Sequence, residues 1–469
     1  MYQSTICIDL GASYSKIAYR HGTSNPGKRY EEESRIVFVD GSPLVPSLAV
    51  QTEDPSQPWI FGRKAAGLTP GPGLTVHVNW KLGLFTPSVT PDSATAIIIA
   101  SEFFKWLKNK LEAAGCPTSQ SRVRITMPEF GNAKAQASVL MRCMNLAGWR
   151  PKELVAESEP RANFLGLFTK GRNYVSHPPR AFDPFINFGQ MYGHGNELIQ
   201  AARNQTLFGT NHRVFRYVIL DIGAYTSDVA LVEVDPTGGD EYDDGIRRHS
   251  QKSLAHGIIN ELDQPLFAAL LVKYSVQPAA LKFETRELWK QSLYNGRTLK
   301  DLLPGRGLVT LGAGAEADVI RKHIASFEEV LWRQIADYCR AFNPNLLILT
   351  GGGSRIALLR EAVQKRFATL GTKSREVDDH QATPSARLEL RKWYESGETL
   401  ARLATGLGGT SVILNAPKRV RPNEARAVSP QPEPHHNAFV RRGWRTCVCG
   451  GMNEDCGICG GRGEIRAGP

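Results

Sequence analysis

Two turns in the chain combine an aspartate, a glycine and a hydroxyl side chain within a few residues. The first is Asp9–Lys16 and the second, about 210 residues later, is Asp221–Asp228. Glycine lets backbone N–H groups approach a phosphate, the hydroxyl adds a donor, and the aspartate orders Mg²⁺ through water. Either turn alone is also typical of an ordinary hairpin. Together they predict a phosphate site shared by two halves of the chain, lined by Gly11, Ala12, Ser13, Tyr14, Gly223, Ala224, Tyr225 and Thr226.

A third glycine-rich segment follows the continuously apolar run Leu346–Thr350. After the glycines comes a stretch with helical periodicity. Bare backbone near the start of a helix is a surface against which a nucleotide can lie. We therefore expect the nucleotide to contact Gly351, Gly352, Gly353, Ser354 and Arg355.

The elements that position these segments alternate between strand-like and helical patterns, which is typical of an α/β protein. Short apolar runs that end in glycine turns suit central strands covered on both faces. We expect strands at Thr5–Leu10, Lys16–Tyr19, Arg122–Met127, Val214–Asp221 and Leu346–Thr350, and helices at Ala94–Ala114 and Ala133–Gly148.

The chain divides by composition into three parts. Residues 1–415 hold the alternating pattern, interrupted at 170–211 by a Gly-, Asn- and His-rich insertion with a short helix expected at 197–204. Residues 416–437 are rich in Pro, Arg and Glu, which predicts a flexible linker. Residues 438–469 form a small module that contains four of the eight cysteines.

Composition sets broad limits on function. Hydrophobic residues make up 41% of the 469 positions and charged residues 22%, which is ordinary for a soluble globular protein. No apolar run is long enough to span a bilayer, and the N-terminus lacks the pattern of a signal peptide, so we expect a cytoplasmic protein without membrane contact. The net charge of +11 is compatible with nucleic-acid binding and equally with a role in solubility.

Further segments strengthen the nucleotide hypothesis, namely Val45–Val50, Phe61–Ala66, Trp80–Gly83, Ile125–Pro128, Ala147–Trp149, Glu157–Ala162 and Glu287–Leu293. In order and spacing these segments and the three glycine turns resemble the actin, hexokinase and heat-shock chaperone superfamily, and within it the DnaK-type seventy-kilodalton chaperones. The resemblance covers about residues 4–415. It implies a two-lobed actin-like ATPase fold, with duplicated mixed five-stranded sheets and flanking helices, that binds ATP and Mg²⁺.

The resemblance also implies roles for single residues. Lys81 would reach the attacking water and the γ-phosphate, and Glu159 would join the network around that water. Asp9 and Asp221 would order the waters of Mg²⁺, with Asp228 or Asp221 as proton acceptor. From the residues alone, Lys81 is also typical of a surface lysine beside an exposed tryptophan, and Glu159 of an acid favoured at a helix N-terminus.

The adenosine side would be formed by a helix that carries Glu287 and Lys290. Their spacing places both on one helix face, where they would meet ribose and adenine. Beside them, Gln291 and Tyr294 stand where the chaperones have an arginine and a serine.

The phosphate turns depart from the chaperone pattern as well. Ala12 replaces a threonine, and Ala224 and Tyr225 replace two glycines. We therefore expect slow turnover, or a switch that binds ATP and rarely hydrolyses it. The residues after Asn415 are too few for the chaperones' peptide-binding domain, so we expect no client binding of that kind.

The C-terminal cysteines are spaced Cys-x-Cys, six residues, then Cys-x-x-Cys. Four thiolates suit a closed structural Zn²⁺ site, and the glycines between them permit tight turns around the metal. The second half is similar to one zinc repeat of DnaJ-type co-chaperones, and a generic zinc ribbon fits equally well. A redox pair or disulfides are the alternatives. The expected ligands are Cys447, Cys449, Cys456 and Cys459.

We thus expect a chaperone-like ATP-binding switch that acts on an unidentified protein partner through its C-terminal module or its insertion. A nucleic-acid-associated protein regulated by ATP is the alternative, because arginines and a tryptophan flank the cysteines. A sugar or small-molecule kinase is less consistent with the Glu-x-x-Lys helix and the Glu-Pro segment, which are chaperone-like. An actin-like filament is a fourth alternative.

Overall fold

The computed structural model describes residues 4–22, 34–85, 91–129, 133–168, 215–234, 246–275, 281–303, 306–344, 346–376, 402–410, 444–446 and 464–466. The chain divides into two compact units, Met1–Asn415 and Ala416–Pro469. The predicted insertion at 170–211, its helix and the linker at 416–437 lie outside the described residues. The first unit is an α/β structure with several mixed sheets.

Sheet I is built around the first predicted turn. Its strand order is β3 (Ser34–Ile36), β2 (Tyr14–Arg20), β1 (Thr5–Asp9), β8 (Arg122–Met127) and β9 (Glu153–Ser158). The short β4 (Val45–Pro46) also pairs with β2. β1 runs antiparallel to β2 and parallel to β8. All five residues of β1 are buried, as expected for a central strand covered on both faces.

Sheet II is built around the second turn in the same way. Its order is β12 (Ile246–Leu254), β11 (Ser227–Val234), β10 (Phe215–Ile222), β15 (Leu346–Thr350) and β16 (Lys373–Glu376). β10 runs antiparallel to β11 and parallel to β15, which repeats the relation of β1 to β2 and β8. The two sheets therefore share one strand order without a recognisable repeat in the sequence.

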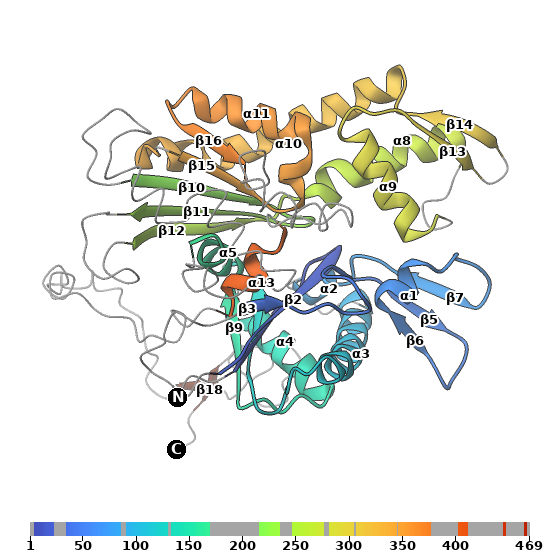
Figure 1. The fold of residues 1–469 in the computed structure, drawn as a ribbon, viewed down its shortest axis with the longest axis vertical. Helices are drawn as coiled ribbons and strands as arrows, with labels where there is room; N and C mark the ends of the chain where they lie inside the picture. Colours follow the sequence, from blue (N-terminus) through green and yellow to red (C-terminus); the bar gives the residue numbers. More distant parts are fainter. Residues whose placement is uncertain are drawn as a thin grey trace, which may run out of the picture. The chain divides into compact units, whose positions relative to one another are not determined.

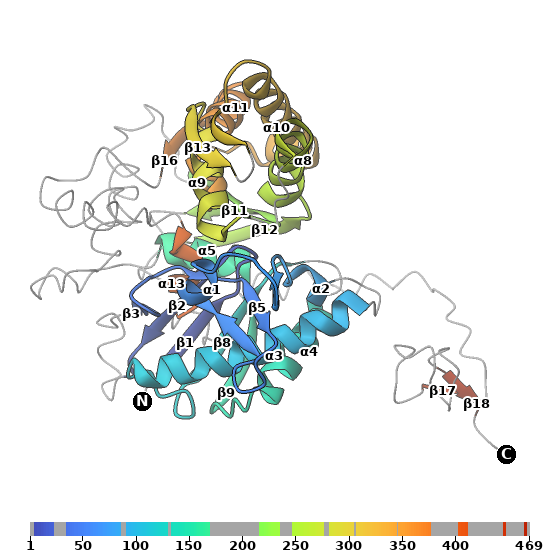
Figure 2. The same cartoon turned by 90° about the vertical axis from the view of Figure 1, so that its right-hand side faces the viewer.

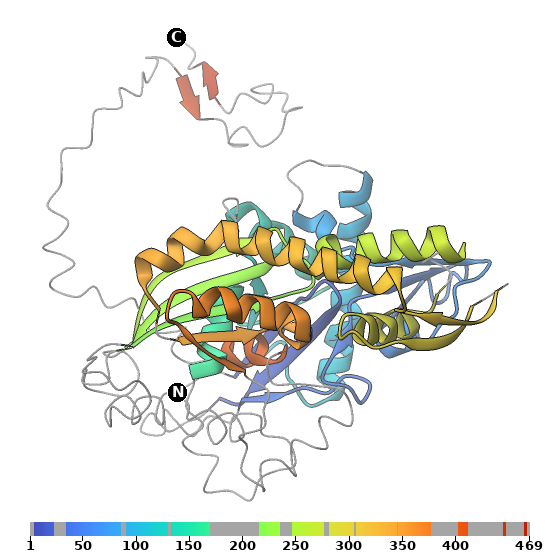
Figure 3. The same cartoon turned by 90° about the horizontal axis from the view of Figure 1, so that it is seen from above.

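Helices cover the outer faces of both sheets. α3 (Pro91–Ala113) and α4 (Ala133–Leu146) pack on sheet I, with Phe103, Phe104 and Leu140 fully buried (Figures 1 and 2). α10 (Ala315–Phe342) and α11 (Ala357–Ala368) lie over sheet II (Figures 1 and 3). The four helices bury the apolar faces that give the two sheets their separate cores.

Two shorter helices, α5 (Glu159–Phe168) and α13 (Ala404–Gly408), lie between the sheets and against each other (Figure 2). A side chain at Gly166 would collide with the backbone of Ala404, and one at Gly408 with the backbone of Ala162. The two helices therefore touch backbone to backbone, which only glycine permits at these positions.

Two buried arginines of sheet I hold the C-terminal end of α13. Arg20 Nε donates to the carbonyl of Thr410 and Arg124 Nη1 to the carbonyl of Gly409, both at 2.7 Å. Carbonyl groups at the end of a helix lack partners within the helix and attract positive charge. These bonds fix α13 on sheet I although about 285 residues or more separate the partners in the chain.

Smaller elements complete the first unit. The remaining elements are β5 (Ala49–Thr52), β6 (Trp59–Phe61), β7 (Leu74–His77), β13 (Leu299–Leu303), β14 (Gly307–Leu311), α1 (Gly62–Ala66), α2 (Leu82–Phe85), α8 (Gln264–Tyr274), α9 (Phe283–Leu293), the π-helical turn η3 (Ile259–Asp263) and the 3₁₀ turn η5 (Gly352–Arg355). In the second unit β17 (Trp444–Thr446) pairs with β18 (Glu464–Arg466).

Candidate functional site

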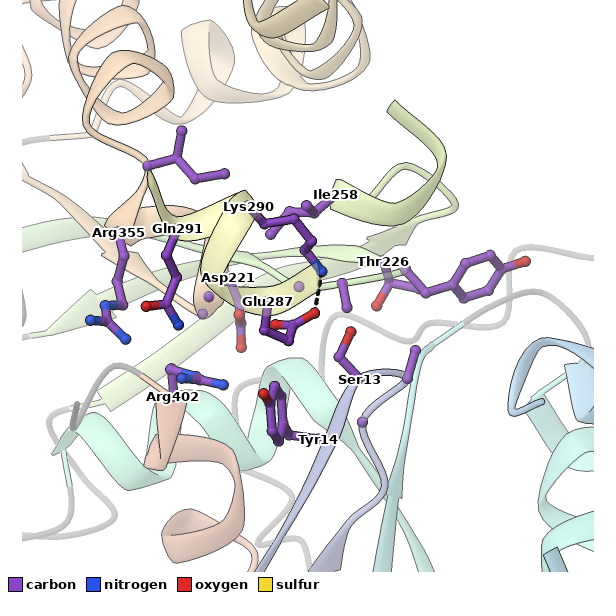
Figure 4. A pocket seen from close by; sticks show the side chains of 18 of the residues that line it. Ser13, Tyr14, Asp221, Thr226, Ile258, Glu287, Lys290, Gln291, Arg355 and Arg402 are labelled. Atoms are coloured by element: carbon purple, nitrogen blue, oxygen red, sulfur yellow. Dashed lines mark hydrogen bonds and ion pairs between the residues drawn. The ribbon is translucent and has the colours of Figure 1, made fainter. Parts of the chain in front are cut away.

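A cavity of about 440 Å³ lies where both predicted turns, α9 and the glycine segment after β15 meet (Figure 4). All five predicted catalytic residues line it, as do thirteen of the fifteen predicted nucleotide contacts. The lining residues that had been predicted are Asp9, Gly11, Ala12, Ser13, Tyr14, Lys81, Glu159, Asp221, Gly223, Ala224, Tyr225, Thr226, Asp228, Glu287, Lys290, Gly351, Gly352 and Arg355.

Gly353 and Ser354 are the two predicted contacts that do not line this cavity. Both are buried, and Gly353 packs against Ile222 so closely that a side chain there would collide. Ser354 Oγ donates to the carbonyl of Gly351 at 2.7 Å. The 3₁₀ turn η5 thus places these two residues inward, against β10 and the backbone of the glycine segment.

The first turn holds Asp9 between two partners. Lys16 Nζ lies 2.8 Å from Asp9 Oδ2, and Thr126 Oγ1 donates to Asp9 Oδ1 at 3.3 Å. Lys16 faces Asp9 across the β1–β2 pair and also lines the cavity. Lys16 was not among the predicted site residues, although its register opposite Asp9 follows from the hairpin. The turn therefore offers a cation as well as backbone donors to an anionic ligand.

The second turn is braced by the segment that follows β12. Gly223 N–H donates to the carbonyl of Thr226 at 2.8 Å, which closes the turn. The carbonyls of Gly223 and Ala224 accept bonds from the N–H groups of Ile258 and Ile259 at 3.2 and 2.7 Å. These bonds hold the turn in place although Ala224 and Tyr225 replace two glycines of the chaperone pattern.

Asp221 is oriented by residues from α5 and α13. Asn163 Nδ2 donates to Asp221 Oδ2 at 2.6 Å, and Thr405 Oγ1 lies 3.4 Å from the same oxygen. Thr350 Oγ1 in turn donates to Asn163 Oδ1 at 3.3 Å. Burial raises the pKa of Asp221 to about 7; Lys16 lowers it, and the nearby carboxylates of Asp9 and Glu159 raise it further.

Asn163 was not predicted from the sequence. The available signal was its position four residues after Glu159, which places both side chains on one face of α5. Thr405 carried no such signal, because it reaches the cavity from a helix 184 positions away from Asp221.

Lys81 and Glu159 form a buried ion pair, with Nζ 3.0 Å from Oε1. Lys81 is 4% exposed and Trp80 6%, so the alternative of a surface lysine beside an exposed tryptophan is wrong. Glu159 is also the first residue of α5, where the helix dipole favours an acid. Burial raises the pKa of Glu159, while the neighbouring Lys81 opposes the shift.

Asp228 faces Asp221 across the β10–β11 pair and is 5% exposed. Burial raises the pKa of Asp228 well above its ordinary value, and the carboxylates of Glu159 and Asp221 raise it further. Ser253 Oγ donates a hydrogen bond to Asp228 Oδ1 and opposes the shift. A buried carboxylate of this kind is a stronger base than an exposed one.

The α9 end of the cavity carries a compact polar network. Lys290 Nζ lies 2.5 Å from Glu287 Oε1 and 2.8 Å from Asp263 Oδ2, and Tyr294 Oη donates to Asp263 Oδ1 at 2.6 Å. Burial alone would lower the pKa of Lys290, but Asp263 and Glu287 together raise it. The prediction that Glu287 and Lys290 share a helix face is confirmed, while Asp263 was not foreseen.

Arg402 and Tyr14 add a cation and an aromatic ring to the same end. The Arg402 guanidinium lies 4.9 Å from the centre of the Tyr14 ring, and that ring contacts Phe283 of α9 edge-on at 5.5 Å. In the view of Figure 4, Arg355, Gln291 and Arg402 gather at one end of the cavity. Flat cations and aromatic rings are groups against which a nucleobase can stack.

The predicted zinc ligands Cys447, Cys449, Cys456 and Cys459 lie outside the described residues. The strands that bracket them, β17 and β18, are antiparallel, with Thr446 opposite Glu464. Within the described part of the chain, no three His, Cys, Asp or Glu side chains are grouped so as to hold a metal ion. The described helices likewise include none with the length and apolarity of a membrane span.

Comparison of the chain with known protein families and with curated proteins finds no match.

Proposed function

We propose that residues 1–415 form an ATP-binding switch of the actin and heat-shock chaperone type, with slow ATP hydrolysis. The observation that carries the proposal is that two Asp-Gly turns, about 210 residues apart, line one cavity. Its volume of about 440 Å³ lies within the range of small-ligand sites. The shared strand order of sheets I and II supports a duplicated, two-lobed fold of the actin type.

The two turns would hold the triphosphate through backbone N–H groups, the hydroxyls of Ser13 and Thr226, and Lys16. Carboxylate oxygens are the protein ligands that Mg²⁺ prefers, and Asp9 and Asp221 present them beside both turns. When bound with the nucleotide, Mg²⁺ would neutralise charge on the phosphates. The nucleoside would lie toward α9, among the flat and polar side chains at that end.

Hydrolysis needs a positioned water molecule more than covalent chemistry. The buried pair of Lys81 and Glu159 would orient the water beside the γ-phosphate, and Asp228 would accept its proton. Alanines at positions 12 and 224 remove a hydroxyl and a glycine from the chaperone pattern. We therefore propose that turnover is slow and that binding itself is the main event.

Nucleotide binding would be transmitted through the helices between the sheets. Asn163 of α5 and Thr405 of α13 both contact Asp221, so a shift of this carboxylate would change contacts of both helices. A protein partner would then recognise the change in the packing of α5 and α13.

For the second unit we propose a structural Zn²⁺ site formed by the four clustered cysteines. The pairing of β17 with β18 supports it, because it brings together the two ends of the cysteine segment. So short a segment buries little apolar surface, and bound metal would supply its folding free energy.

Calorimetry with MgATP and an ADP-release assay test the nucleotide proposal, with Asp221→Asn as the site variant. Binding of MgATP together with slow transfer of its γ-phosphoryl group to water supports the proposal. Transfer of phosphate to a small-molecule acceptor would favour a kinase instead, and ATP-dependent light scattering would favour a filament. No affinity for any adenine nucleotide would overturn the proposal.

A further inference from the structure

Ser253 stands directly opposite Asp228 in the pairing of β11 with β12. Its side chain is 7% exposed, and its hydroxyl donates a hydrogen bond to Asp228 Oδ1. A serine hydroxyl has one proton to donate, and here that proton goes to the carboxylate. One oxygen of Asp228 is thus held by sheet II itself.

The same hydroxyl accepts a bond from sheet I. The backbone N–H of Glu129, two residues after the end of β8, donates to Ser253 Oγ at 2.7 Å. A hydroxyl that accepts one bond becomes a better donor in the next. Glu129 N–H, Ser253 and Asp228 therefore form a relay that crosses from one sheet to the other.

A second contact between the sheets lies beside this relay. Gln251 Nε2 on β12 donates to Ser158 Oγ at the end of β9, at 3.0 Å. Ser158 Oγ in turn lies 3.3 Å from Glu129 Oε2. Ser158 directly precedes Glu159 in the chain. The first crossing contact therefore ends at Asp228 and the second ends next to Glu159, and both of these carboxylates line the cavity.

We propose that Ser253 is a positioning residue, which fixes Asp228 Oδ1 so that the other carboxylate oxygen can accept the proton of the attacking water. The relay is complete only when the ends of β8 and β12 are in contact. Approach of the two sheets would therefore align the Asp228 carboxylate at the same time. This inference rests on the proposed ATPase function and adds a residue that none of the sequence motifs contains.

The test compares Ser253→Ala with Ser253→Thr, which restores a hydroxyl. We expect kcat of the alanine variant to fall about 10- to 100-fold while KM for MgATP stays within about twofold, because alignment is lost and binding is kept. The threonine variant should recover kcat to within about threefold. Ser121→Ala is the matched control, since the hydroxyl of this buried serine donates to the carbonyl of Pro117, away from the cavity lining, and its loss should leave kcat unchanged.

An independent readout is hydrogen exchange of the Glu129 amide in nucleotide-free protein. It should be about tenfold faster in Ser253→Ala than in the parent and in Ser253→Thr. If the alanine variant does not fold, Ser253→Cys, a weaker donor of similar size, should show the same changes in part. Unchanged kcat or unchanged Glu129 exchange in a folded variant would overturn the role of Ser253. Absence of hydrolysis by the parent protein would instead overturn the proposed function.

Discussion

Lys81 Nζ lies 3.0 Å from Glu159 Oε1, and both side chains are buried although 78 positions separate them in the chain. The pair joins the segment before α2 to the first turn of α5. Each charge is compensated mainly by the other, so the pair matters for stability as well as for the proposed chemistry.

Replacing Lys81 with methionine should therefore destabilise the protein by about 3 kcal/mol, because it leaves a buried carboxylate without its partner. The double variant Lys81→Met/Glu159→Gln should recover part of this loss. Urea denaturation gives the free energies of unfolding for both. The control Lys105→Met, at a mostly exposed pair with Glu102, should change stability by less than about 1 kcal/mol.

The same variant separates binding from hydrolysis. We expect Lys81→Met to bind MgATP with an affinity close to that of the parent, because in the proposed site backbone groups of the two turns would hold the phosphates. It should hydrolyse MgATP at least about tenfold more slowly. Calorimetry and ADP release measure the two steps. Unchanged turnover would remove Lys81 from the mechanism.

Stability should depend on the ionisation of Asp221. The folded protein keeps this carboxyl protonated up to about pH 7, whereas the unfolded chain releases the proton near its ordinary value of 3.8. Between these values the folded state binds more protons, so the free energy of unfolding should fall as pH rises from about 4 to about 7. Glu159 and Asp228 have raised pKa values and act in the same direction.

Thermal denaturation of ligand-free protein across this range checks the expectation. Asp221→Asn should be less pH-dependent than the parent, and Asp337→Asn, at a side chain 98% exposed, should behave like the parent. A parent protein that gains stability steadily from pH 4 to 7 would contradict the prediction.

Asn163 should be needed for the orientation of Asp221. Asn163→Ala removes a bond of 2.6 Å to a carboxylate oxygen, and bonds to charged groups contribute about 1.5–3 kcal/mol. We expect the affinity for MgATP at neutral pH to fall about tenfold, measured by calorimetry. The control Asn145→Ala lies on an exposed position of α4 and should leave the affinity unchanged.

The C-terminal module should contain one zinc ion per chain, detectable by elemental analysis of protein purified without added metal. Cys456→Ser should lower the zinc content, because three thiolates form an incomplete structural site. A chelator should remove the metal without affecting MgATP binding by the first unit. Zinc-free protein with four reducible cysteines in two disulfides would contradict this prediction.

Much of the fold could be predicted from local pattern. β8 and β15 have the predicted bounds. β1 ends one residue earlier than predicted, and β10 begins and ends one residue later. β10 and β15 belong to apolar runs that end in glycine turns, β1 lies just before Gly11, and β8 ends at Pro128, so local sequence is sufficient to predict where these strands lie. That Glu287 and Lys290 share one face of α9 likewise follows from helical geometry.

The partners of the site residues could not be predicted in this way. Asn163, Ser253 and Asp263 each bond a residue of the cavity through contacts that form only in the folded chain. Of the three, only Asn163 carried a local signal, which is the face of α5 that it shares with Glu159; Ser253 and Asp263 had none, since a single hydrogen bond needs one side chain in one place. Tertiary packing therefore determines both the surroundings of the cavity carboxylates and their pKa values.

The attachment of α13 to sheet I has a consequence for synthesis of the protein. Thr405 and Arg402 belong to the last described segment of the first unit, yet they complete a cavity whose first residues are Asp9 and Gly11. A nascent chain that has emerged only as far as β16 already contains both glycine turns but lacks these two side chains. On the ribosome, the first unit therefore gains a finished pocket only after nearly all of its length has been translated, and a chain truncated just after β16 would leave the pocket open.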